Sequence, residues 1–246
     1  MFRLALRQTE GLIGSIIALL GLDLAVPDHT TLSRRAETLE VFRPRPSSDP
    51  VHLLADSTGL KLCGSGEWLL EKHGTKTWRS WRKLHIAMDT DTGQIAVAVL
   101  TTSEIDDASQ GGPLLDQINS RVASFTADGA YDQDGVYAEM AARHPEACVI
   151  VPPRRNAVPS DTSDTAPTKR DHHLRVIAER GRKAWQKASG YHWRALVEAD
   201  ISRLKRVIGD ALRSRTNRRR TTEMVIAVAA LNRMLERGRP EYVRLT

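Results

Sequence analysis

The chain has 246 residues, 41% of them apolar, and a formal net charge of +6, which is enough for a catalytic domain with a small appendage. Its two cysteines, Cys63 and Cys148, have no paired spacing, which argues against a disulfide framework and against a zinc ribbon. The longest apolar run is too short to cross a bilayer and lacks a signal-peptide cleavage site. We therefore expect a protein of the reduced cytoplasm with no membrane partner.

The charge is unevenly distributed along the chain. The net charge is 0 over residues 1–50, −6 over residues 51–150 and +12 over residues 151–246. An acidic middle followed by a basic final third predicts a carboxylate-rich site beside a surface that attracts polyanions. The competing interpretation is a basic protein whose lysines and arginines are simply solvated.

Two short helices are predicted near the N-terminus, at residues 10–20 and 30–39, with turn and N-cap residues between them. The second, HTTLSRRAETL, is interpreted either as a recognition helix with Arg34 and Arg35 facing phosphate or as a plain packing helix. The stretch FRPRPSSDP then breaks the periodicity and predicts a linker near residues 42–50.

The middle of the chain has the pattern of a mixed α/β sheet covered by helices. Leu84, Ile86 and Met88 alternate along the sequence, as in a strand with one buried face. Three closely spaced strands indicate a meander, and strands alternate with helices after it. The predicted strands begin at Val51, Trp81, Gln94, Ala123 and Ala147, the predicted helices span residues 107–122, 134–143, 172–188, 191–213 and 221–235, and residues 156–171 are predicted to form a flexible loop.

Two aspartates follow apolar strand patterns directly, Asp56 after HLLA and Asp128 after SFTA. Taken singly, each is typical of a turn residue. Both are followed by small or glycine residues, which leave room for a ligand, and a carboxylate at the tip of a buried strand favours a metal. The pair therefore predicts a metal-binding edge of the sheet.

A further acid, Glu198, shares a predicted helix face with three other chemically useful residues. At 100° per residue, Tyr191, Arg194, Glu198 and Lys205 all point to one side of the helix at 191–213. An exposed Arg and Glu pair one turn apart contributes only about 0.3 to 0.5 kcal/mol and explains neither the tyrosine nor the eight basic residues against one acid in residues 203–220. Trp193, about 200° away, is predicted to be core.

The spacing Y(2)R(3)E(6)K of these four residues matches the signature of insertion-sequence transposases with a catalytic triad of two aspartates and a glutamate. The segments LLADSTGLKL, WRKLHIAMD and TADGAYD resemble the same family around its two aspartates, in the same order. The resemblance covers about residues 50–235 and is strongest to the bacterial group named after insertion sequence five. It implies a ribonuclease H-like, five-stranded mixed sheet flanked by helices at 46–240, after a partial DNA-binding helical segment at 1–45.

The resemblance also implies a function. Asp56, Asp128 and Glu198 would together hold two magnesium or manganese ions. The protein would be a DNA transposase that cuts at element ends and transfers the 3′-hydroxyl to target DNA. Tyr191, Arg194 and Lys205 would contact the DNA. The partners implied are element ends and target DNA, with a homodimer at synapsis, in a bacterial cytoplasm near the nucleoid.

Two other functions remain open in the sequence. Family members begin several dozen residues earlier, and the start of this chain resembles the middle of a helix, so an internal start or a truncated product is expected. The rival function is then a truncated, non-catalytic DNA-binding remnant of a transposase. A hydrolytic nuclease of the same fold is the third.

Several other patterns have competing interpretations. The stretch RTNRRRTTE, with Arg218, Arg219 and Arg220, is interpreted as phosphate-binding or as a solvated turn, and KTWRSWRK at 76–83 as a DNA contact or a strand entry. The segment CGSGEW is not a phosphate-binding loop, because it lacks GK(S/T). His172 and His173 are not expected to bind metal. The remaining acids that could replace a member of the triad are Asp89, Asp91, Asp106, Asp107 and Asp132, of which Asp132 is the easiest to mistake for Asp128.

Overall fold

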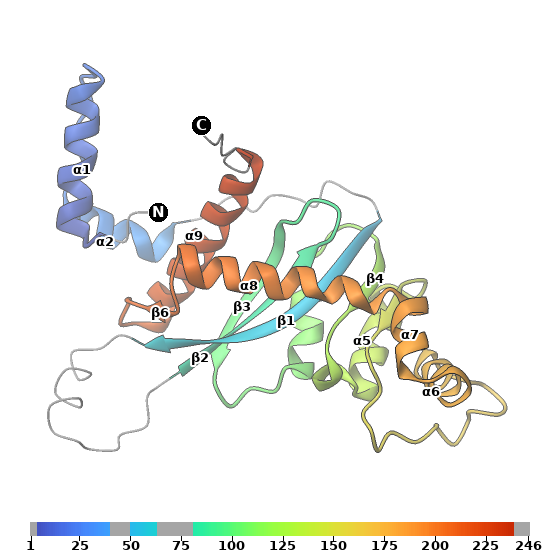
Figure 1. Cartoon of the computed structure of the whole chain (residues 1–246). Coiled ribbons are helices and arrows are strands. Elements are labelled where there is room, and N and C mark those ends of the chain that lie inside the picture. Colours follow the sequence, from blue (N-terminus) through green and yellow to red (C-terminus); the bar gives the residue numbers. More distant parts are fainter. Residues whose placement is uncertain (1–3, 40–49, 63–80, 239–246) are drawn as a thin grey trace, which may run out of the picture.

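A computed structural model of the chain describes residues 4–39, 50–62 and 81–238, and its centre is one mixed β-sheet (Figure 1). The strands form where the apolar alternation predicts them. A short sixth strand joins the five expected ones, and it lies where the sequence predicts the end of a helix. The strands are β1 (Val51–Leu62), β2 (Trp81–Asp89), β3 (Ile95–Thr102), β4 (Val122–Thr126), β5 (Cys148–Ile150) and β6 (Ala211–Leu212).

The order of the strands is β3-β2-β1-β4-β5, with β6 paired to the far end of β1. The first three strands form the expected antiparallel meander. The strands β4 and β5 then add in parallel beside β1, and β6 is also parallel to it. This mixed arrangement, covered by helices, confirms the ribonuclease H-like fold that the resemblance implies.

Helices cover both faces of the sheet and bury two apolar clusters. Residues of α8 and α9, among them Val197 and Leu231, pack on Leu54, Leu60 and Ile86 on one face. The opposite face packs against α4 and α5. The described helices are α1 (Leu6–Leu19), α2 (His29–Thr38), α4 (Gly111–Leu115), α5 (Asp134–Arg143), α6 (Lys169–Arg180), α7 (Arg182–Ser189), α8 (Ala195–Val207) and α9 (Asn217–Glu236), with 3-10 turns η1 (Ala108–Gln110), η2 (Gly129–Tyr131) and η3 (Tyr191–Arg194).

Three predicted helices differ in the structure. The helix predicted at 107–122 is only the turn η1 and the short α4, which contains two glycines and Pro113. The helix predicted at 172–188 is two helices, because Gly181 between them has a φ of 81° that other residues rarely adopt. The helix predicted at 191–213 begins at Ala195, ends at Val207 and is followed by β6.

Because α8 begins only at Ala195, the prediction that Tyr191 shares one face of this helix with Arg194, Glu198 and Lys205 is wrong. Gly190, with a φ of 75°, ends α7, and residues 191–194 then form the turn η3 rather than α-helix. A 3-10 turn has about three residues per turn, so the 100° arithmetic does not apply to it. For the same reason the prediction that Trp193 is core is wrong, because its side chain is 55% exposed.

The N-terminal segment forms two helices near the predicted places. Glu10 of α1 accepts hydrogen bonds from the backbone and ring of His29 on α2, at 2.9 Å each. Glu37 of α2 pairs with Arg219 of α9 at 2.8 Å, which attaches α2 to the sheet domain. Figure 1 shows α1 standing away from the sheet. The division into domains at residue 45 stays a prediction, since the linker near 42–50 lies almost wholly outside the described residues.

Two other sequence segments also lie outside the described residues, namely CGSGEW and residues 76–80 of the basic tryptophan stretch. Within the part of the chain that the structure describes, no helix is long and apolar enough to cross a membrane.

Candidate active site

The sheet brings Asp56 and Asp128 to neighbouring positions. The parallel strands β1 and β4 pair as far as Leu54 and Thr126. Asp56 lies two residues beyond the last pair on β1, and Asp128 lies two residues beyond it after β4 ends. Asp56 is therefore inside a strand rather than at its tip as predicted, because β1 continues, paired to β2, to Leu62. Asp56 is partly exposed because β4, which pairs with β1 as far as Leu54, ends before it.

The backbone fixes one oxygen of each aspartate. Asp56 Oδ1 accepts a hydrogen bond from the backbone N–H of Ser57 at 2.8 Å. Asp128 Oδ1 accepts one from Ala130 at 2.9 Å and so caps the turn η2. Each side chain is held in one orientation, and its Oδ2 remains available for another partner.

That partner in both cases is the guanidinium of Arg194. Its Nη2 lies 3.0 Å from Asp56 Oδ2 and 3.7 Å from Asp128 Oδ2. Its Nη1 pairs with Glu198, one turn further along at the start of α8. The Nε of Arg194 is buried and has no hydrogen-bond partner among the described residues. The three acids predicted from distant parts of the sequence thus surround one cation; we call these four residues the acid centre.

Burial and charge act against each other in the acid centre. Burial raises the pKa of Asp56 above its ordinary value, while Arg194 opposes the rise and Asp128 and Glu198 add to it. Burial also disfavours the charged form of Arg194, but the three acids and Tyr191 together raise the pKa of its guanidinium. The guanidinium therefore stays charged and neutralises part of a group that formally carries three negative charges.

The guanidinium of Arg194 takes a position on which carboxylate oxygens converge. Asp56 and Asp128 each present an oxygen to the same nitrogen, so these two oxygens are no further apart than the sum of the two distances to it. Carboxylate oxygens are the ligands that magnesium and manganese prefer. Across the described ranges, no group of three or more His, Cys, Asp or Glu side chains could hold a metal ion as it stands. A cation held between Asp56 and Asp128 would have to take the place of the Arg194 guanidinium.

Tyr191 lies beside the acid centre although it is not on α8. Its ring packs against Trp185 of α7, with centroids 5.6 Å apart, and Trp185 packs against His173 of α6 at 5.3 Å. Burial raises the pKa of the Tyr191 hydroxyl, Arg194 opposes the rise, and the acids of the centre add to it. His173 thus serves in an aromatic stack that supports Tyr191. Lys205 is exposed in the last turn of α8, away from η3.

The structure gives Asp132 a different environment from Asp128. Its side chain is fully buried and pairs with Arg170 Nε at 2.7 Å. It also accepts a hydrogen bond from the backbone N–H of Arg154 at 2.8 Å. Asp132 therefore ties the segment after β5 and the start of α6 to the sheet. Of the other acids, Asp107 faces Lys83 and His85. Asp106 accepts a hydrogen bond from the side chain of Gln133. Asp89 accepts hydrogen bonds from the backbone N–H of Asp91 and the hydroxyl of Thr92 in the β2–β3 turn.

The predicted DNA-binding arginines have different surroundings. Arg218 is exposed at the start of α9, Arg219 pairs with Glu37, and Arg220 donates to the backbone oxygen of Ser214 at 2.9 Å. The sequence did not single out Arg82, which shares the oxygen of Asn217 with Arg220. The only signal for it was its place in the basic tryptophan stretch.

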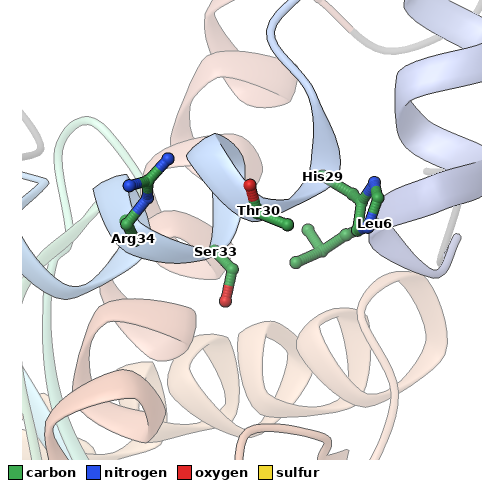
Figure 2. A pocket seen from close by; sticks show the side chains of 5 residues that line it. All are labelled: Leu6, His29, Thr30, Ser33 and Arg34. Atoms are coloured by element: carbon green, nitrogen blue, oxygen red, sulfur yellow. The ribbon is translucent and has the colours of Figure 1, made fainter.

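Arg34 and Arg35 are exposed on α2. A hollow of about 520 Å³ lies beside Arg34 and is lined by the start of α1 and by α2. Figure 2 shows Leu6 and His29 at one end of it and Thr30, Ser33 and Arg34 along α2. Its lining contains no carboxylate, so this hollow is distinct from the acid centre and gives no support to either interpretation of α2.

Comparison with known protein families identifies two matching regions. Residues 47–233 match a family described as the transposase DDE domain. Residues 1–65 match a second family with the same description. The first match includes the whole acid centre, Tyr191 and Lys205, and the second includes α1, α2 and all of β1 with Asp56.

Proposed function

The chain belongs to the transposase DDE domain family, and from this premise we propose that it cuts DNA at the ends of an insertion sequence and joins the exposed 3′-hydroxyl to target DNA. Membership of the family makes it a transposase, an enzyme whose substrate is DNA. The more detailed proposal includes the group named after insertion sequence five, to which the Y(2)R(3)E(6)K spacing is similar. The single observation that supports it most is the convergence of Asp56, Asp128 and Glu198 on one cation.

We assign the metal ligands to these three carboxylates. Two magnesium or manganese ions held there would activate the attacking hydroxyl and stabilise the departing 3′-oxyanion. Asp56 and Asp128 suit this role because Ser57 and Ala130 already hold one oxygen of each, so the second oxygen needs little further ordering. Glu198 is the most exposed of the three, with 58% of its side chain accessible to solvent.

The residues around the acids would bind the substrate. Once released from the carboxylates, the fork of Arg194 can grip a phosphate with two parallel hydrogen bonds. Tyr191, which packs on Trp185, presents its hydroxyl or ring to the DNA beside the cut. Lys205 would contact a phosphate further along α8 as a point charge.

The reaction balances in two displacements at phosphorus. In the first, a water oxygen bonds to the phosphorus and the water proton passes to solvent or to a carboxylate, while the 3′-oxygen leaves and takes up a proton to become the 3′-hydroxyl. In the second, that 3′-oxygen bonds to a phosphorus of the target, and the 3′-oxygen of the target leaves with the proton of the attacking hydroxyl. Two element ends are joined in the second step, so we propose a homodimer at synapsis.

The test is a strand-transfer assay with oligonucleotides that carry the DNA flanking the gene, in magnesium or manganese. The wild type should cut and join, and Asp56→Asn should bind the same DNA and do neither. Asp116→Asn, which changes an exposed acid, is the matched control and should behave as the wild type does. Binding without cutting by the wild type would favour the non-catalytic remnant, and cutting without joining would favour the nuclease.

A further inference from the structure

Two arginines from distant parts of the chain share one amide oxygen at the start of α9. Arg82 Nη2 donates to Asn217 Oδ1 at 3.0 Å, and Arg220 Nη1 donates to the same oxygen at 3.1 Å. Arg82 also donates to the backbone oxygen of Trp81, and Arg220 donates to that of Ser214. The two like charges are therefore fixed in one place by neutral oxygens.

Two acids, Glu104 and Glu223, interact with the charge of this pair but form no ion pair with it. Within residues 4–39, 50–62 and 81–238, neither Arg82 nor Arg220 forms an ion pair, whereas the neighbouring Arg219 does. Glu223 is close to Arg220, but its carboxylate oxygens accept the backbone N–H groups of residues 213 and 214. Burial, and then the nearby charge of Arg82, lower the pKa of Arg220, and Glu223 opposes this only in part.

The start of α9 adds to the same field. The helix has 20 residues, so its N-terminus carries a partial positive charge, and its first backbone N–H groups have no acceptor within the helix. The hydroxyl of Thr216 accepts a hydrogen bond from the backbone N–H of Arg219. The backbone N–H of Asn217, the first residue of the helix, has no acceptor within the helix. Backbone donors and two guanidinium forks thus meet at one point, which is the arrangement that binds a phosphate.

This point lies on the same face of the sheet as the acid centre. Arg82 pairs with Leu60, which is four residues after Asp56 on β1 and therefore on the same side of the strand. At about 3.3 Å per residue, Leu60 is roughly 13 Å from Asp56.

We propose that Arg82, Arg220 and the first turn of α9 around Asn217 form a second phosphate-binding site, which holds the DNA backbone on the same face of the sheet as the acid centre. This inference rests on the proposed function, because it takes DNA as the substrate. The site contains none of the acids, so it binds and positions the strand and takes no part in the displacement steps.

The sharpest test is Asn217→Asp in the full chain, with DNA binding measured in EDTA. The carboxylate pairs with both arginines and also stabilises the start of α9, so the melting temperature should stay the same or rise. DNA affinity should nevertheless fall about ten-fold, and the slope of log affinity against log salt should decrease by about one. Unchanged affinity and slope in a folded variant would overturn the proposal.

Removing the arginines tests whether they grip the same phosphate. Arg82→Ala and Arg220→Ala should each weaken DNA binding several-fold. The double variant should lose about one unit of salt slope rather than two, because only one phosphate contact is lost. Arg233→Ala removes the same charge from the far end of α9 and should leave affinity and slope unchanged. If each single variant lost about one unit of salt slope and the double variant lost about two, the arginines would contact different phosphates and the shared phosphate would be contradicted.

The outcomes also separate this inference from the proposed function. Binding in EDTA requires no chemistry, so a chain that binds DNA through this site but never cuts it would refute only the proposed function. A chain whose Asn217→Asp variant still cuts and binds normally would refute only this site. If inorganic phosphate raises the melting temperature of the wild type but not of Asn217→Asp, while DNA affinity is equal in both, the site binds free anions and not DNA.

Discussion

Replacement of Arg194 by alanine tests the arrangement of the acid centre without DNA. The change leaves three carboxylates around an empty space; the Asp56 side chain is 13% exposed and the Asp128 side chain 36%. Removing one partner of a fully buried ion pair costs about 3 to 5 kcal/mol. The acid centre is open to solvent at Glu198, so we expect a smaller cost of about 2 kcal/mol at pH 7. In a chain of this length that corresponds to a fall of roughly 4 to 8 °C in melting temperature.

The same variant should respond more strongly to a divalent cation. In the wild type the cation must displace a guanidinium that is paired with all three acids, and in Arg194→Ala it need not. If that displacement costs about 1.4 kcal/mol, the variant binds magnesium or manganese about ten-fold more tightly. The assay is thermal denaturation over a magnesium series, because the rise in stability follows the ratio of free metal to its dissociation constant.

A surface arginine provides the matched control. Arg143 pairs with Asp116 at 2.8 Å on an exposed face, and such pairs contribute less than about 1 kcal/mol. Arg143→Ala should therefore change the melting temperature little and leave the magnesium response unaltered. If Arg194→Ala is as stable as the wild type and magnesium stabilises both equally, the guanidinium does not lie between the carboxylates and our reasoning is refuted.

Three further predictions concern other parts of the chain. Lys205→Ala should weaken DNA binding and lower its salt slope by about one unit, and an unchanged slope would exclude a phosphate contact. Asp132→Ala should lower the free energy of unfolding by about 3 kcal/mol in urea, since it leaves Arg170 unpaired, yet keep the magnesium response, which loss of a metal ligand would remove. Burial lowers the pKa of His85 to about 4, against the opposing effect of Asp107, so the unfolded chain takes up this proton first on acidification. Stability should therefore fall by up to about 3 kcal/mol between pH 6.5 and 4, and His85→Gln should flatten this part of the profile; equal profiles would contradict a buried neutral histidine.

The strands and the gathering of the acids follow from local patterns in the sequence. Alternation in segments such as 84–88 marks buried strands, and an acid directly after an apolar run marks where the neighbouring strands β1 and β4 stop pairing, although β1 itself continues past Asp56. Asp56 and Asp128 are therefore predictable as neighbours once β1 and β4 are placed side by side. Glu198 required the family spacing, because nothing local distinguishes it from an exposed helical acid.

The remaining features depend on backbone geometry and on contacts far apart in the chain. Gly190 ends a helix in a left-handed conformation, which the periodicity of the sequence does not reveal. The periodicity therefore predicts that Tyr191 and Trp193 are α-helical, although the α-helix begins only at Ala195. The position of Arg194 between the acids depends on the sheet and α8 together. The pairing of Arg82 with Asn217 joins residues 135 positions apart, which no local pattern predicts.

The most direct test of the metal-binding role of the acid centre is a crystal structure of the full chain grown with manganese and measured for anomalous scattering. We predict a manganese peak at coordination distance from Asp56 Oδ2 and Asp128 Oδ2, with Arg194 moved away from both carboxylates. A structure in which Arg194 still joins the three acids at saturating manganese, with no peak beside them, would contradict the account.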